Sequence, residues 1–403
     1  MKHGISILLS LRCDPDRSNS LALMLRSRAP RAWVHGLGKL CGVRGVSKHE
    51  GHRPPSPSRR RLRRLLRMRA ELEPRRVARS LRVEPRAALA ALFLALLAMP
   101  ATAQDYPSRP ITLIVPYSAG GGNDLMARTA AEKMSKTLGQ QIVIENRGGA
   151  GGSIATRQIA KSAPDGYTLG LGGTGTLAIN PTLYGSVGYD PRKDFAPIGL
   201  IATSALVVCV HPSLPVRSIP DLIALAKKSP GTLTYASAGT GSGIHLGSEY
   251  FAASAGIKLT HVPYKGSSPA LTDLIGGHVA IYFSSLPPAV ALVKEGKVRA
   301  LAVTSAKRSP IFPDLPTVAE AALPGYEAVL HYGIVAPAGT PRPIIDKLSA
   351  ALRAAVTSDE LRSRLADDGA EPLASTPEEY AADIDREENK WSAIVKTSGA
   401  KVD

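Results

Sequence analysis

The sequence predicts an α/β protein of two lobes, and three features of the chain indicate this fold. From Pro110 onward, short apolar strands alternate with helical patterns, an order typical of α/β domains with mostly parallel sheets. Two apolar segments, 205–211 and 329–336, run into prolines instead of helices, and we expect them to cross between the lobes. Glycine-rich loops follow several strands, where a ligand could approach the main chain closely.

The positive charge of the chain is concentrated in its first 103 residues. Residues 1–103 contain 22 Lys and Arg against 6 Asp and Glu, whereas residues 104–403 contain 28 against 27, so the two parts carry +16 and +1. A nucleic-acid site needs basic side chains held on a folded face. The basic run at 59–64 instead lies among prolines and serines with no repeated apolar pattern. We therefore expect no nucleic-acid partner.

Residues 82–103 have the layout of a secretory signal peptide. Arg82 and Arg86 precede an apolar run at 87–98, and small residues before Gln104 fit cleavage after Ala103. The run is too short for a membrane span, which needs about 20 residues. Because a signal peptide normally begins near its own methionine, we interpret residues 1–81 as a non-functional extension from a misassigned start. We expect a soluble periplasmic monomer.

The pattern after the leader assigns the elements and the lobes. Strands are expected at 111–115, 142–145, 233–236, 279–283 and 298–303. Asp124 is expected to cap a helix that ends at Gly139, and Ser218 and Thr376 are expected to begin later helices. The predicted lobe 1 comprises 104–208 and 332–403, and the predicted lobe 2 comprises 209–331. Cys209 is interpreted as a buried small apolar residue.

The glycine loops predict an anion site. The clearest are 117–124, 147–155 and 236–245, with a looser one at 171–177. A nucleotide phosphate is the first hypothesis, but the acidic residue of a dinucleotide fingerprint and the Lys-Ser or Lys-Thr of a Walker loop are missing. The loops at 117–124 and 236–245 contain no Lys or Arg, so N–H groups and hydroxyls would bind the anion. Each loop alone could be only a tight turn.

For an exported protein we expect a small carboxylate as ligand and no cofactor. Asp124 is expected to cap its helix and could also orient the ligand. His245 could donate to the ligand or serve only as a capping side chain. The candidate ligand-binding residues from these two loops are Tyr117, Ser118, Gly120, Gly121, Asp124, Ser237, Gly239, Thr240, Gly241 and His245.

Catalysis is the alternative. Ser118, Ser237 or Ser242 could be a nucleophile of a secreted serine hydrolase. No Ser, His and Asp trio can be assembled from the sequence, and no Gly-x-Ser-x-Gly motif occurs after the leader. The histidines of the mature chain show no metal-ligand spacing, so we expect no metal and no enzyme activity.

From about Tyr106 to the C-terminus, the sequence resembles the receptors of tripartite tricarboxylate transporters, also called Bug receptors. The segments that carry the resemblance are YPSRP at 106–110, VPYSAGGGND at 115–124, ENRG at 145–148, APDGY at 163–167, INP at 179–181, VPYKG at 262–266, LAVTS at 301–305 and APAGT at 336–340. The resemblance implies a type II periplasmic-binding-protein fold, whose two lobes close on an organic acid and present it to membrane subunits.

A ligand sensor that feeds a signalling partner is a further alternative. The resemblance also implies that Thr174, Thr176, Tyr264 and Ser284 border the cleft. Asn123, Ser284 and the pair at 331–332 depart from the residues usual in the family.

Overall fold

The alternation of strands and helices predicted from the sequence is confirmed. The computed structural model describes residues 106–402, so the predicted extension at 1–81, the signal peptide at 82–103 and the cleavage site lie outside the described residues. The strands are β1 (Ile111–Val115), β2 (Ile142–Asn146), β3 (Thr168–Gly173), β4 (Phe195–Val210), β5 (Thr234–Ser237), β6 (Thr260–Pro263), β7 (Ile281–Ser285), β8 (Arg299–Val303), β9 (Val329–Pro337) and β10 (Ala370–Pro372). The helices are α4 (Gly122–Leu138), η4 (Ala150–Gly152), α5 (Ser153–Ala160), η5 (Thr174–Ile179), α6 (Asn180–Tyr184), α7 (Ile219–Lys228), α8 (Gly243–Ala255), α9 (Ser267–Ile275), α10 (Leu286–Lys294), α11 (Val318–Ala321), α12 (Arg342–Val356), α13 (Asp359–Asp367) and α14 (Pro377–Ser398).

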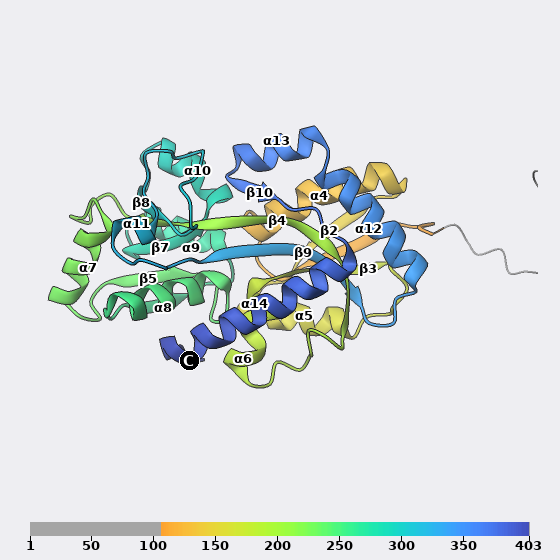
Figure 1. The fold of residues 1–403 in the computed structure, drawn as a ribbon, viewed down its shortest axis with the longest axis horizontal. Helices are drawn as coiled ribbons and strands as arrows, with labels where there is room; N and C mark the ends of the chain where they lie inside the picture. Colours follow the sequence, from red (N-terminus) through yellow and green to blue (C-terminus); the bar gives the residue numbers. More distant parts are fainter. Residues whose placement is uncertain (1–105, 403) are drawn as a thin grey trace, which may run out of the picture. The chain divides into compact units, whose positions relative to one another are not determined.

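Two long strands join the lobes. The order of the strands is β2-β1-β3-β9-β4-β7-β5-β6, and β8 and β10 also pair with β4. The pairs are parallel between β1 and its neighbours β2 and β3, and between β5 and its neighbours β6 and β7. β4 and β9 are antiparallel to each other and run side by side through the middle of Figure 1. The crossing-strand prediction is confirmed.

The first crossing strand is longer than the sequence indicated. β4 begins at Phe195, whereas the apolar pattern marked only residues from Ala205 onward. Pro197 and Gly199 interrupt the strand signal, and the structure accommodates them with a register shift between β4 and β9. Cys209 in β4 is fully buried and not in a disulfide. Burial raises the pKa of its thiol to about 12, which fits an inert apolar role.

The C-terminal helix packs on both lobes. α14 contacts the crossing strand β4 as well as η5 and α8, and Figure 1 shows it lying along the crossing strands. Its Trp391 is fully buried, with the indole N–H donating to Glu387 at 3.0 Å. The capping boxes at Thr376 and Thr317 begin α14 and α11. Thr376 confirms the sequence prediction, as does the Ser218 cap of α7.

Asp124 does not cap its helix, which corrects the sequence prediction. α4 begins after Gly121, so Asp124 is the third residue of its first turn. Its carboxylate accepts the N–H of Gly120, which lies ahead of the helix, at 2.9 Å. The helix starts early because glycines at 120–122 let the chain turn tightly, and Gly120 has a φ of +79° that disfavours other residues. Gly139 ends α4 in the left-handed conformation, as predicted.

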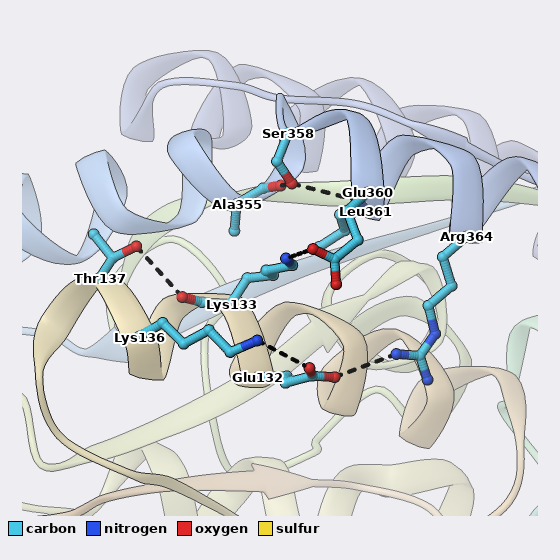
Figure 2. A network of polar contacts seen from close by, with 9 residues as sticks. All are labelled: Glu132, Lys133, Lys136, Thr137, Ala355, Ser358, Glu360, Leu361 and Arg364. Atoms are coloured by element: carbon cyan, nitrogen blue, oxygen red, sulfur yellow. Dashed lines mark hydrogen bonds and ion pairs between the residues drawn. The ribbon is translucent and has the colours of Figure 1, made fainter.

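Packing and ion pairs fix α4 in its lobe. Met126, Ala130 and Met134 on its inner face are fully buried, and the helix packs against α12. Figure 2 shows the polar contacts between α4 and α13. There Lys133 pairs with Glu360, and Glu132 accepts from Lys136 and Arg364 at 3.3 Å each. Exposed pairs contribute about 0–1 kcal/mol each, so the buried face does most to hold the helix and its N-terminus in place.

Candidate functional site

A small cavity lies where the loops after β1, β3, β5, β6 and β7 face β9. Its volume is about 20 Å³. That is room for roughly one water, so an organic acid can enter only if the surrounding groups move apart. The residues that line it are Tyr117, Asn123, Gly173, Thr174, Gly175, Thr176, Ala238, Ser242, Gly243, Ile244, Ser267, Ser285, Leu330, His331 and Tyr332.

Four helix N-termini converge on this cavity. Asn123, Gly243 and Ser267 lie in the first turns of α4, α8 and α9, and Ser285 directly precedes α10. The first N–H groups of a helix have no partner within it and carry the positive end of the helix dipole. The N-cap residues of α4, α9 and α10 make no side-chain hydrogen bond to the helix start. The cavity lining contains no Lys or Arg. It is suited to an anion held by backbone N–H groups and hydroxyls.

Asp124 and Asn146 fix the loop after β1. Asp124 accepts from Gly120 N–H and from Arg128 Nε, both at 2.9 Å. The side-chain amide of Asn146 donates to the second Asp124 oxygen at 2.9 Å and to the carbonyl of Tyr117 at 3.1 Å. Burial alone would raise the pKa of Asp124, but the hydrogen bonds from Arg128, Gly120 and Asn146 together hold it below its usual value. The carboxylate is engaged with the loop and does not line the cavity.

Two histidines and a serine fix the loop after β5. Ser237 Oγ accepts the N–H of Gly239 at 3.0 Å and lies 2.6 Å from His261 Nε2. His245 Nδ1 accepts the N–H of Gly241 at 3.3 Å, and the rings of His245 and His261 stack with centroids 4.2 Å apart. Burial and the neighbouring His261 lower the pKa of His245 to about 3. The ring of His245 is therefore neutral and supports the loop from behind.

Two tyrosines bring hydroxyls to the lining. Tyr117 donates to the carbonyl of Gly151 at 3.0 Å, and burial raises its pKa above the usual value. Tyr332 is 2% exposed, and its hydroxyl makes no hydrogen bond at standard geometry to the described residues. This hydroxyl and that of Ser285 both lie beside Gly122, the first residue of α4. Burial also raises the pKa of Tyr332, so its phenol stays protonated and can donate.

The structure brings three of the predicted site residues to the cavity. Tyr117, Thr174 and Thr176 line it. The other candidates lie in the surrounding loops, strand ends and first helix turns, behind or beside the lining residues: Ser118, Gly120, Gly121, Asp124, Ser237, Gly239, Thr240, Gly241, His245, Tyr264 and Ser284.

Several of these candidates miss the lining by one position or point elsewhere. The hydroxyl of Ser284 donates to the carbonyl of Ser285, and Ser285 is the residue that lines the cavity. Tyr264 donates to Asp273 of α9, and burial with this hydrogen bond raises its pKa to about 12. A Cβ at Gly121 would lie 3.1 Å from the Cβ of Ser267, so Gly121 faces the lining residue of the other lobe.

Sequence reasoning missed the serines and the segment of β9. Ser267 and Ser285 stand between a strand and a helix, the same signal that marked the glycine loops, but without a glycine run. Tyr332 and His331 were noted only as departures from the family. His331 donates its N–H to Thr174 Oγ1 at 2.9 Å, and its Nδ1 lies 2.9 Å from Asp383. Their place at the cavity depends on the crossing of β9 between the lobes, which sequence spacing does not show.

Within residues 106–402, no group of three or more His, Cys, Asp or Glu side chains is placed to hold a metal ion. In the same range, no helix is long and apolar enough to cross a membrane.

Known structures share this fold. A Rhodopseudomonas palustris protein solved with adipate is 41% identical, with a TM-score of 0.72, and the match covers 74% of this chain and 100% of that one. The periplasmic binding protein BugD is 38% identical with a TM-score of 0.71, covering 73% and 99%. MatC of R. palustris, solved with malate, is 35% identical with a TM-score of 0.70, covering 72% and 100%. The predicted periplasmic-binding-protein fold is confirmed.

Sequence comparisons agree. Protein BugT of Bordetella pertussis is 38% identical over 307 residues, which are 76% of this chain and 94% of BugT. Residues 126–400 match the model of the tripartite tricarboxylate transporter family receptor. The resemblance seen in the motifs is thereby confirmed, and the chain belongs to the tripartite tricarboxylate transporter receptor family.

Proposed function

We propose that this protein is a periplasmic receptor that captures a small organic carboxylate and delivers it to the membrane subunits of a tripartite transporter. The convergence of four helix N-termini on one cavity without a Lys or Arg is the observation that carries the proposal. Such a site neutralises a carboxylate by N–H and O–H donation. The binding of adipate and malate by similar receptors supports the ligand class.

The mechanism that we propose is closure about β4 and β9. The lining residues come from loops on both sides of these strands, so a bound carboxylate contacts both lobes and favours the closed form. A differential affinity of about 5.5 kcal/mol is enough to invert a 1:99 balance between open and closed states. Tyr117, Thr174 and Thr176 would bind from one lobe, with Ser267 and Ser285 from the other. The lobe boundaries at 208/209 and 331/332 remain predictions.

The remaining residues of the two predicted loops have supporting roles in this proposal. Asp124 holds the loop after β1, and His245 holds the loop after β5, through the N–H groups that they accept. We propose no cofactor, no metal and no nucleic-acid partner. Export would follow from cleavage after Ala103, with the mature receptor acting as a monomer in the periplasm.

A serine hydrolase is the competing function, and the pair Ser237–His261 is the feature that would favour it. Ser237 is fully buried, accepts the Gly239 N–H, and does not line the cavity. A nucleophile must reach its substrate, so this pair fits support of a loop better than catalysis.

Thermal stabilisation and turnover together test the proposal. The purified protein is melted with short-chain mono- and dicarboxylates, including malate and adipate, and is separately assayed with ester and amide substrates. A receptor should melt higher with at least one carboxylate and show no turnover that depends on Ser237. Ester or amide hydrolysis that is lost in Ser237→Ala would support the hydrolase instead. A sensor would stabilise in the same way but would bind a signalling partner in pull-down experiments.

A further inference from the structure

Outside the cavity, the two lobes also touch each other through a patch of main chain. We call it the rim contact, and it joins Ser118, Ala119 and Gly148 to Lys265 and Ser268. The N–H of Ser118 donates to the carbonyl of Lys265 at 3.2 Å. The hydroxyl of Ser268 donates to the carbonyl of Ala119 at 2.6 Å. The first segment follows β1 and β2, and the second follows β6, so these bonds connect opposite lobes.

Gly148 is what allows the main chains to come this close. A Cβ at Gly148 would lie 2.5 Å from the carbonyl oxygen of Lys265 and 3.5 Å from the nitrogen of Ser118. Real Cβ atoms essentially never approach a backbone atom at 2.5 Å. Gly148 does not have a positive φ, so an alanine at this position could adopt the same backbone conformation. The need for glycine at 148 therefore arises from the other lobe.

None of the rim-contact residues Ser118, Gly148, Lys265 and Ser268 lines the cavity. The contact can exist only when the lobes are closed, since the segments belong to different lobes that are joined by β4 and β9. Any free energy that it contributes stabilises the closed form and is absent from the open form. The apparent affinity of a ligand depends on the fraction of protein in the binding-competent form.

We infer that Gly148 and Ser268 determine ligand affinity through the rim contact, without touching the ligand. This inference rests on the proposed function, because it needs a ligand that binds the closed form. Gly148 permits the approach, and Ser268 adds a hydrogen bond across it. A change at either position weakens binding by destabilising closure, and ligand release becomes faster.

Three variants of the purified protein test this inference: Gly148→Ala, Ser268→Ala and the control Thr272→Ala. Thr272 lies one turn beyond Ser268 in α9, and its hydroxyl donates to the carbonyl of Ser268 within that helix. Affinity is measured by calorimetry with the tightest-binding acid of a panel that includes malate and adipate. Closure is measured as the decrease in radius of gyration on ligand addition, by small-angle X-ray scattering.

Gly148→Ala should lower affinity more than tenfold and reduce the ligand-induced decrease in radius of gyration. Ser268→Ala loses one neutral hydrogen bond and should lower affinity about 2- to 10-fold. Thr272→Ala should bind like the wild type, and the melting temperatures without ligand should agree. If Gly148→Ala fails to fold, Ser268→Ala alone decides the question.

The outcomes separate the two proposals. If the wild type binds an acid and closes, but Ser268→Ala and Gly148→Ala match it in affinity, the inference is overturned while the proposed function stands. If the wild type binds no acid of the panel and shows no closure, the proposed function is wrong, and the inference that rests on it is overturned as well.

Discussion

Removing the hydroxyl of Tyr332 should weaken ligand binding without destabilising the protein. This hydroxyl is buried at the cavity beside the N-terminus of α4 and makes no hydrogen bond at standard geometry to the described residues. A hydrogen bond to a charged group is worth about 1.5–3 kcal/mol, so Tyr332→Phe should raise the Kd of a carboxylate roughly 10- to 150-fold. Because the lost hydroxyl makes at most a weak hydrogen bond, to Ser285, the melting temperature without ligand should change little.

Calorimetry at neutral pH measures the change in affinity, and Tyr380→Phe is the matched control. Tyr380 is also buried with an unpaired hydroxyl among the described residues, but it lies in α14 and does not line the cavity. The control should bind like the wild type. If Tyr332→Phe binds the acid as tightly as Tyr380→Phe does, the cavity is not the ligand site that we describe.

Three further predictions concern the loops. Gly121→Val should abolish binding with the fold intact, because even a Cβ at this position would lie 3.1 Å from the Cβ of Ser267 in the other lobe. Unchanged affinity in calorimetry would count against a ligand site at this loop. Asp124→Asn should lower the melting temperature at pH 7 by removing the charge that pairs with Arg128. Since the pKa of Asp124 is lowered on folding, its contribution is present above about pH 4 and is lost as the pH falls through the folded value, so the difference from wild type should shrink in acid melts. His245 has a folded pKa of about 3, below the unfolded value near 6.5, so the unfolded chain binds a proton first as the pH falls. Between these two pH values, the free energy of unfolding of the wild type should fall by up to about 1.4 kcal/mol per pH unit on acidification. A His245→Asn variant whose stability has the same pH slope would contradict this.

The sequence predicted the order of elements and the crossing strands because both leave local signals. β9 shows a mostly apolar segment that runs into Pro337, and Thr376 and Ser218 show the residue types that cap helices. The early part of β4 was missed because Pro197 and Gly199 break the strand pattern, and only pairing with β9 holds them in the sheet.

The loops that the sequence marks as the candidate site surround the cavity, but only Tyr117, Thr174 and Thr176 among the predicted residues line it. Glycines and hydroxyls in a loop predict free N–H groups, yet Gly120 and Gly241 give theirs to Asp124 and His245. Which N–H groups remain free depends on side chains that fold back on the loop, and spacing does not reveal this. Tyr332 comes from a strand more than 200 positions after the first loop, and only the fold brings it to α4.

Native mass spectrometry of the protein purified from the periplasm tests the central claim most directly, because it weighs whatever the cavity has retained. We predict one bound species per chain with the mass of a small organic acid, absent from Tyr332→Phe prepared in the same way. A protein that carries no acid, and that still binds none after incubation with a wide panel of mono- and dicarboxylates, would contradict the account.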